Sequence, residues 1–210
     1  MEIQQVADAD FPTAWGHFRI LGFEGRTADP EPCNETQPAP ALRVEVAVAL
    51  VMGDLTTGPA PILRIHSQCL TGDVFHSLRC DCRQQLELAL ETIATAGRGL
   101  IVYEQQEGRG IGLLAKLKAY ELQDKGRDTI EANLELGYKA DCRVFELPAQ
   151  VLQHLGIRAV RLMTNNPEKV SALEEHGIEV VERISAVVPE SDFNTRYLET
   201  KREKMGHLVS

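Results

Sequence analysis

Short apolar runs alternate along this chain with stretches whose apolar residues recur at helical spacing, and no other sequence feature constrains the fold as strongly. Strands are predicted over residues 15–23, 44–52, 62–65, 100–103, 160–163 and 178–181. Helices are predicted over residues 86–93, 113–123 and 151–155. Gly97 and Gly126 are typical helix stops, and Asn166-Pro167 is typical of a helix start. The alternation indicates an α/β fold, a single domain over residues 1–210 with a mixed β-sheet covered by helices.

The stretch from about residue 25 to residue 40 interrupts this alternation. It contains four prolines among small and polar residues, and proline disfavours both a helix interior and a central strand. We therefore predict a mobile surface loop here, which carries Cys33.

Charge and hydropathy exclude several classes of partner. The formal net charge is −9, whereas nucleic-acid binding is built largely from clustered Lys and Arg, so no nucleic-acid partner is expected. A small anionic ligand stays compatible with this charge, because a pocket can be locally basic. No apolar run approaches the ~20 residues that span a bilayer, and the N-terminus lacks a secretion signal. We expect a cytoplasmic protein with no membrane contact.

Three of the five cysteines form a cluster, Cys69, Cys80 and Cys82, with the spacing Cys-x10-Cys-x-Cys. Structural zinc takes four protein ligands, whereas catalytic zinc keeps one position open for a water whose pKa falls to about 7. The spacing alone leaves three interpretations open: catalytic zinc, structural zinc closed by His66 or His76, and buried thiols without metal. The zinc nucleobase deaminases are excluded, because the chain lacks their His-x-Glu and Pro-Cys-x-x-Cys motifs.

A glycine-rich loop over residues 105–112 follows the predicted strand 100–103. In α/β folds ligands bind at such strand ends, and glycine allows close approach of the backbone. Glu107 could pair with the N1–H and amino group of a guanine and Arg109 with phosphate, although both could be solvated loop charges. The helix that follows should place Leu113, Leu117 and Tyr120 on one face.

Six separated motifs together resemble the GTP cyclohydrolase II family in order and spacing. They are RIHSQCLTGD at 64–73, RCDC at 79–82, QEGRGIGL at 106–113, DTIEAN at 128–133, TNNP at 164–167, and YLETK with KMGH between 197 and 207. The resemblance extends over nearly the whole chain.

The resemblance implies roles for individual residues. Cys69, Cys80 and Cys82 would hold catalytic zinc. The GTP site would be lined by Arg64, Ile65, His66, Ser67, Gln68, Gln85, Glu107, Gly108, Arg109, Thr129, Thr164 and Lys169.

Three further residues would act in catalysis. Arg143 would attack the α-phosphorus of GTP and release diphosphate, with Asp141 accepting its proton, because a guanidinium is otherwise protonated in proteins. Tyr120 would serve the later hydrolysis at C8 of the guanine. Without the resemblance, Asp141 and Arg143 would be interpreted as a surface ion pair and Tyr120 as a core residue.

The implied reaction is zinc-dependent hydrolysis of GTP to 2,5-diamino-6-(5-phosphoribosylamino)pyrimidin-4(3H)-one, formate and diphosphate, the first step of riboflavin biosynthesis. Mg²⁺ would accompany the triphosphate. A homodimer is implied, and so is a monofunctional chain, because 210 residues leave no room for the butanone-phosphate synthase domain often fused upstream in this family.

Two positions depart from the family pattern: Gln68 stands where glutamate is usual, and Gln105 where arginine is frequent. Both changes remove charge from the expected pocket. They leave two alternatives, a paralogue that releases a formamidopyrimidine nucleotide and a non-catalytic zinc- and nucleotide-binding module. Retention of Asp141, Arg143 and Tyr120 argues against the second, because binding alone needs no nucleophile.

Overall fold

The computed structural model describes residues 1–28, 31–34 and 41–189, and the single positions 195, 199–200, 202, 206 and 208. Half of the predicted loop at 25–40 and most of the motif between 197 and 207 therefore lie outside the described residues.

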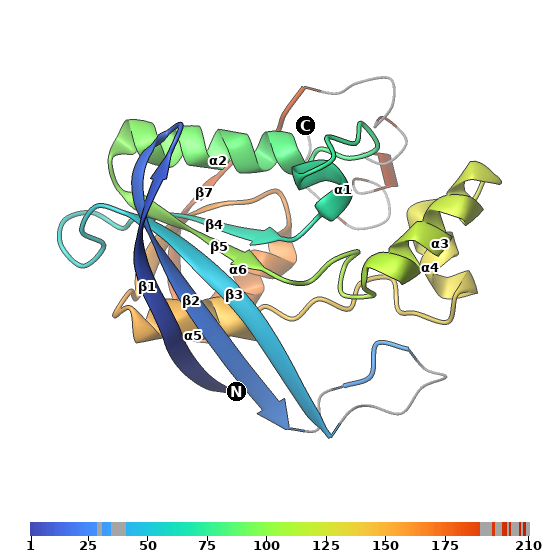
Figure 1. Ribbon diagram of the computed structural model, residues 1–210, viewed down its shortest axis with the longest axis horizontal. Coiled ribbons are helices and arrows are strands. Elements are labelled where there is room, and N and C mark those ends of the chain that lie inside the picture. The colour runs from blue at the N-terminus through green and yellow to red at the C-terminus, as the bar shows by residue number, and fades with distance from the viewer. Residues whose placement is uncertain are drawn as a thin grey trace.

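A seven-stranded sheet forms the centre of the molecule, in the order β1-β2-β3-β5-β4-β6-β7 (Figure 1). The strands are β1 (Glu2–Thr13), β2 (Gly16–Ala28), β3 (Leu42–Met52), β4 (Ile62–Ser67), β5 (Gly99–Glu104), β6 (Ala159–Met163) and β7 (Glu179–Ile184). Pairing is antiparallel from β1 through β3 to β5 and parallel from β5 through β4 and β6 to β7. The predicted α/β class with a mixed sheet is confirmed.

Six helices are present in the described part of the chain. They are α1 (Leu70–Asp73), α2 (Cys82–Ala96), α3 (Leu113–Asp124), α4 (Thr129–Glu135), α5 (Glu146–His154) and α6 (Pro167–Glu175). Helix α2 covers one face of the sheet and α5 and α6 cover the other, while α3 and α4 lie together beyond the strand ends (Figure 1).

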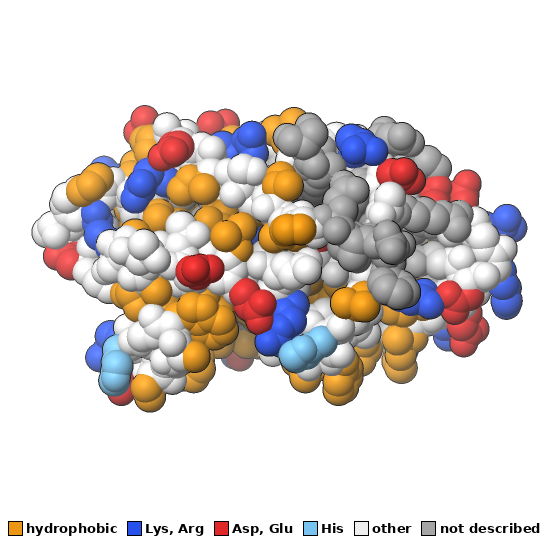
Figure 2. All heavy atoms as spheres, turned by 90° about the horizontal axis from the view of Figure 1, so that it is seen from above, with side chains coloured by type: hydrophobic (Ala, Val, Ile, Leu, Met, Phe, Trp, Pro, Cys, Tyr) orange, Lys and Arg blue, Asp and Glu red, His pale blue; other side chains and the backbone are white. Residues whose placement is uncertain are grey.

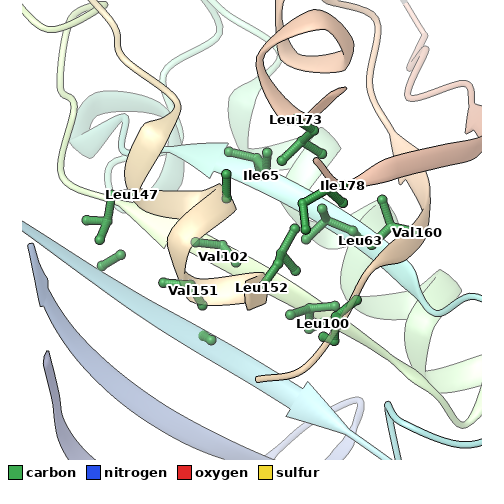
Figure 3. Close-up of a cluster of buried hydrophobic side chains, with 14 of the residues drawn as sticks. Leu63, Ile65, Leu100, Val102, Leu147, Val151, Leu152, Val160, Leu173 and Ile178 are labelled. Carbon is green, nitrogen blue, oxygen red and sulfur yellow. The ribbon is translucent and has the colours of Figure 1, made fainter. Parts of the chain in front are cut away.

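Each face of the sheet has its own hydrophobic core. Leu63, Leu100 and Val102 of the central strands pack against Leu152 of α5 and Leu173 of α6 (Figure 3). On the opposite face, three α2 residues at helical spacing pack against β4, β5 and β2: Ala89, Leu90 and Ile93. Parallel strands buried on both faces consist of nearly continuous apolar runs, and β4 and β5 follow this pattern.

Helix boundaries follow the capping residues of the sequence. Gly97 ends α2 in the left-handed conformation, with φ of 67°. Asp128 begins α4 through a capping box with Glu131, and the Asn166 side chain accepts from the backbone N–H of Glu168 at the start of α6. These caps place the motifs at 128–133 and 164–167 at helix N-termini.

Two local predictions are wrong. Gly25 to Ala28 belong to β2 rather than to a loop, because this segment pairs with residues 42–45 of β3. On α3 the buried residues are Ala115, Lys116 and Ala119, whereas Leu117 is 41% exposed. The helix packs beside α4 and a polar pocket, so small and polar residues occupy its inner face.

The surface seen in Figure 2 mixes both signs of charge with hydrophobic side chains in small groups. In the part of the chain that the structure describes, no helix combines the length and the apolar character needed to cross a membrane.

Candidate active site

A pocket lies where β4, β5 and β6 end, at the carboxyl edge of the parallel strands, which is where ligands bind in open α/β sheets. The three clustered cysteines, Tyr120 and Arg143 all line it. Eleven of the twelve residues expected at a GTP site also line it: Arg64, His66, Ser67, Gln68, Gln85, Glu107, Gly108, Arg109, Thr129, Thr164 and Lys169.

The Sγ atoms of Cys69, Cys80 and Cys82 lie within 4.8 Å of one another, as expected for three ligands of one metal ion. Cys69 follows β4 and precedes α1, while Cys82 is the first residue of α2. Gly72 of α1 closes the group, because a Cβ there would lie 2.8 Å from Cys80 Sγ and 3.2 Å from Cys69 Sγ. Neither His66 nor His76 joins this group among the described residues.

The cysteine cluster favours negative charge on Cys69. Hydrogen bonds from the Cys80 and Cys82 thiols hold the pKa of Cys69 well below its usual range, and the Lys116 ammonium acts in the same direction. Because the Cys80 thiol donates a hydrogen bond to the Cys69 thiolate, the pKa of Cys80 rises to about 11. Thiolates are the form in which cysteine binds metal.

Asp73 fixes the turn that carries Cys69. Its carboxylate accepts from the Cys69 backbone N–H at 3.0 Å and from the Tyr103 hydroxyl at 2.8 Å. It also lies 3.1 Å from Nε2 of His66, whose ring stacks on Tyr103. Burial lowers the pKa of His66, so the neutral ring bonds Asp73 through Nε2–H, and Nδ1 is an acceptor without a partner among the described residues.

Glu107 and Lys116 form a buried ion pair beside the cluster. The Lys116 Nζ donates to Glu107 Oε1 at 2.7 Å and to Cys69 Sγ at 3.2 Å. The Glu107 carboxylate also accepts from the backbone N–H groups of Leu70 and Gly108. Three of its roughly four acceptor positions are thus taken by the chain itself. Glu107 therefore anchors the glycine-rich loop to the cysteine turn.

Three cationic side chains converge on the same pocket. Arg64 is held by Gln85 at 2.6 Å and by the Met163 carbonyl, and Lys169 donates to the Ile65 carbonyl at 2.9 Å. Burial lowers the pKa of Lys169 well below its usual value, and the neighbouring charges of Arg143 and Arg64 lower it further. Mutual repulsion of this kind is relieved when an anion binds among the cations.

Arg143 and Asp141 lie at the wall of this pocket. The Arg143 guanidinium donates to both carboxylate oxygens of Asp141, at 2.9 Å from Nε and 2.5 Å from Nη2. The side chains are only 12% and 15% exposed, so this is not the surface ion pair that the residues alone would suggest. Although burial opposes it, Arg143 holds the pKa of Asp141 below its usual range. Asp141 lines a second cavity, which Arg143 lines as well.

The Tyr120 hydroxyl also reaches the metal-binding group. It lies 3.2 Å from Thr71 Oγ1, which in turn lies 3.6 Å from Cys69 Sγ. The Arg79 guanidinium stands 4.8 Å from the centre of the Tyr120 ring. Burial raises the pKa of Tyr120, so its hydroxyl keeps its proton.

Two residues singled out in the sequence lie elsewhere. The Ile65 side chain is fully buried in the core, and only its carbonyl serves the site, through Lys169. Gln105 is exposed and lines the second cavity rather than the pocket, whereas Gln68 is half-buried and lines the pocket. Of the two departures from the family pattern, only Gln68 lies where it touches the cysteine-lined pocket.

The sequence analysis assigned no role to three polar residues that contribute to the site: Lys116, Asp73 and Glu104. Glu104 is 1% exposed, accepts from the Ser67 hydroxyl at 2.9 Å, and has its pKa raised to about 7 by burial. Asp73 and Lys116 each stand within or beside a quoted motif, so motif position was an available signal. Nothing in the local pattern distinguishes Glu104 from an ordinary strand-end carboxylate.

The fold and the site together define an α/β protein with a three-thiol metal-binding group beside an anion-binding pocket. A sequence profile of GTP cyclohydrolase II matches residues 4–185. GTP cyclohydrolase-2 of Haemophilus influenzae (strain PittEE) is 52% identical over 209 residues, which cover 99% of this chain and 90% of that protein. GTP cyclohydrolase-2 of Shewanella amazonensis is 51% identical, covering 100% of this chain and 95% of that protein.

The chain therefore belongs to the GTP cyclohydrolase II family, and its identification as an enzyme of this class is confirmed. The riboflavin biosynthesis protein RibBA of Chlorobium phaeovibrioides is 50% identical over 208 residues, which cover 99% of this chain and 47% of that protein. Among solved structures, the two-domain 3,4-dihydroxy-2-butanone 4-phosphate synthase RibBX of A. baumannii aligns with a TM-score of 0.45 at 18% identity, over 87% of this chain and 40% of that one.

Proposed function

We propose that this chain hydrolyses GTP with zinc held by Cys69, Cys80 and Cys82, giving the diaminopyrimidine nucleotide, formate and diphosphate. The observation that carries the proposal is that the three-thiol group and the cations Arg64, Arg143 and Lys169 line one pocket. A purine nucleotide has matching parts, a ring to be opened and an anionic phosphate chain.

The thiol group suits zinc on its own chemistry. Three sulfurs within 4.8 Å of one another match a soft, tetrahedral cation, and the described residues offer no fourth Cys, His or carboxylate ligand to the group. Zinc bound there would supply Lewis acidity and would lower the pKa of a water molecule to about 7. Lys116 and Thr71 contact Cys69 Sγ and orient it, as second-layer groups do in metal sites.

The guanine edge would be recognised by groups that the chain leaves available. His66 offers Nδ1 as an acceptor, and Gln68 lies beside it in the pocket. Glu107 has about one acceptor position left after bonding Leu70, Gly108 and Lys116. The base would therefore be read by several neutral and charged acceptors together.

Diphosphate release is assigned to the pair Asp141 and Arg143. Asp141 is ionised and in bidentate contact with Arg143, and it would take a guanidinium proton as a nitrogen of Arg143 bonds to the α-phosphorus. The bond from that phosphorus to the bridging oxygen breaks, and diphosphate leaves with the electron pair. Lys169 and Arg64 would balance the charge of the phosphates, and Mg²⁺ bound with the triphosphate would add to this charge balance.

Tyr120 is assigned to the second hydrolysis, which releases C8 as formate. Its protonated hydroxyl, held near Cys69 by Thr71, can donate to the oxygen on that carbon. The family resemblance further implies a homodimer and a cytoplasmic location, which we include in the proposal.

The test is product analysis with zinc-loaded protein, GTP and Mg²⁺. Equal amounts of the diaminopyrimidine nucleotide, formate and diphosphate are expected by chromatography and enzymatic formate assay. The matched control is Cys69→Ser, which should lose both zinc and turnover. Unchanged GTP at stoichiometric zinc would refute the proposal, and GTP consumption without formate would point instead to a formamidopyrimidine product.

A further inference from the structure

A disulfide joins the two cysteines that the metal-binding group does not use, Cys33 and Cys142. They are 109 residues apart in the sequence, and their Cα atoms are 5.4 Å apart. Cys33 lies in the segment between β2 and β3, whereas Cys142 stands between Asp141 and Arg143. The disulfide therefore ties a loop to the two residues assigned to diphosphate release.

The segment that carries Cys142 has no helix or strand to hold it between Lys139 and Phe145. Its position depends on isolated contacts. The Cys142 N–H donates to the Arg109 carbonyl at 2.9 Å, and the Lys139 N–H donates to the Cys33 carbonyl at 3.2 Å. Next to these, Asn34 and Tyr138 form a single β-bridge. The disulfide is the only covalent member of this set of tethers.

Both cysteines face an open cavity of about 560 Å³, which is also lined by Asp141 and Arg143. A volume of several hundred Å³ is enough for a small-molecule ligand. Arg43 and Lys139 line the same cavity in ion pairs with Glu45 and Glu31, so its wall presents both signs of charge to the ammonium and carboxylate groups of a tripeptide thiol. Both cysteines are half-buried residues that line this cavity, so a small thiol or disulfide can approach the pair from it.

We propose that Cys33 and Cys142 form a reversible thiol–disulfide modification site whose reactants are small thiols and small disulfides of the glutathione class. Its oxidation state sets how firmly the segment with Arg143 is held. The consequence for catalysis rests on the proposed function of Arg143, whereas the modification itself does not. In a reducing compartment such disulfides are usually transient and redox-sensing, which agrees with the cytoplasmic location expected for this chain.

The chemistry balances as two thiol–disulfide exchanges. The Cys33 thiolate attacks one sulfur of the small disulfide, forms a mixed disulfide and expels one small thiolate. The Cys142 thiolate then attacks the Cys33 sulfur and expels the second. Two electrons pass from the two protein thiols to the small disulfide, and the two protons go to solvent or to the released thiolates. A pair of small thiols reverses both steps.

Oxidation is expected to favour catalysis. With the disulfide open, the Cys142 turn loses its covalent tether, while the segment keeps the hydrogen bonds given above and the two bonds between the Gln106 side chain and the backbone of Val144. Small misplacements of a reacting group cost large factors in rate, so we expect kcat to fall roughly fivefold on reduction. The disulfide closes a loop between positions 109 residues apart and so restricts the unfolded chain. Its reduction should therefore lower Tm by roughly 5–10 °C.

The modification is tested by redox titration of the zinc-loaded full chain. The protein is equilibrated at fixed ratios of reduced to oxidised glutathione, quenched with an isotope-coded alkylating reagent and mapped by peptide mass spectrometry. Cys33 and Cys142 should become alkylated together with one midpoint. The site is refuted if both cysteines are alkylated at every ratio, or if each carries only a mixed disulfide with glutathione.

The catalytic consequence is tested with Cys33→Ser, which removes the disulfide and leaves Cys142 and the metal ligands in place. Its kcat and Tm should equal those of reduced wild type and should not respond to the glutathione ratio, while zinc content stays the same. Equal loss of activity in Cys33→Ser and wild type on oxidation would overturn this consequence, because the zinc thiolates would then be responsible. Since alkylation is read without turnover, a protein inactive on GTP whose pair still titrates would overturn the proposed function and support the modification site.

Discussion

The Lys116 Nζ lies 3.2 Å from Cys69 Sγ and makes its other hydrogen bond, at 2.7 Å, to Glu107. Although burial favours a neutral amine, the negative charge around Cys69 raises the pKa of Lys116 above its usual value. The ammonium is therefore charged at any working pH. One cation thus compensates a metal-binding thiolate and the carboxylate that anchors the glycine-rich loop.

Replacing Lys116 with methionine should destabilise the protein, because the substitution leaves the buried Glu107 carboxylate without its cation. Loss of one partner of a buried ion pair lowers the free energy of unfolding by about 3 kcal/mol. Thermal unfolding should report a Tm lower by roughly 5–10 °C. Lys116→Arg keeps the charge and should recover much of the difference. A Tm for Lys116→Met equal to that of wild type would contradict the role assigned to this pair.

Gly72→Ala should weaken zinc binding without changing any charge. The new Cβ would lie 2.8 Å from Cys80 Sγ and 3.2 Å from Cys69 Sγ, so the sulfurs must move apart. Displaced ligands typically cost about tenfold or more in metal affinity, measurable by competition with a zinc chelator. Gly22→Ala is the matched control, because its Cβ would make ordinary contacts at 3.4 Å with Val6 and Ala7. If both variants bind zinc as tightly as wild type, Gly72 has no part in shaping the group.

The sequence predicted the central elements well and the peripheral ones poorly, for physical reasons. β4 and β5 are buried on both faces, so they appear as continuous apolar runs. β1 is an edge strand with mostly exposed residues, and its sequence carries little hydrophobic pattern. Helix α4 has only seven residues, and its capping box at Asp128 was the available sign.

Within the site, residues inside motifs were predicted and long-range partners were not. The three cysteines and the cations of the pocket came from motifs with recognisable spacing. Lys116 contacts Cys69 at a sequence separation of 47 residues, and Cys33 is bonded to Cys142 at a separation of 109. At such separations the spacing of residues in the sequence does not indicate which ones are paired. The inner face of α3 was mispredicted because a polar pocket, rather than the core, selects its residues.

Glu104 should give the protein a stability that falls as pH rises. Burial raises the pKa of its carboxyl from 4.5 to about 7, so the folded state keeps a proton that the unfolded state has lost between these values. The free energy of unfolding therefore decreases by roughly 3 kcal/mol as pH rises from about 4.5 to 7, and this contribution is constant above pH 7. Glu104→Gln mimics the protonated form and should flatten this part of the profile.

The measurement for Glu104 is urea unfolding at a series of pH values, with the zinc concentration held constant. Glu31→Gln is a suitable control, because that side chain is 89% exposed. Parallel pH profiles for wild type and Glu104→Gln would show that Glu104 titrates normally. In that case the contact with Ser67 would be that of an ionised carboxylate.

Asp141→Asn should lower kcat much more than it weakens binding of GTP. The amide keeps the size of the side chain and can still accept from Arg143, but it cannot take the guanidinium proton. Loss of a general base typically costs about 100-fold or more in rate.

The dissociation constant for GTP, measured by equilibrium binding in the presence of Ca²⁺ in place of Mg²⁺, should change much less, because Arg64, Arg143 and Lys169 all remain. Asp10→Asn is the matched control, since Asp10 is 68% exposed and pairs with His17 on β2. The intact mass of the quenched wild-type reaction should reveal a covalent guanylyl adduct that Asp141→Asn fails to accumulate. Turnover in Asp141→Asn within a few-fold of wild type would contradict this role. A proton acceptor that can be removed without loss of rate does not act in the rate-determining step, so the pair of Asp141 and Arg143 would then have a structural role at the pocket wall.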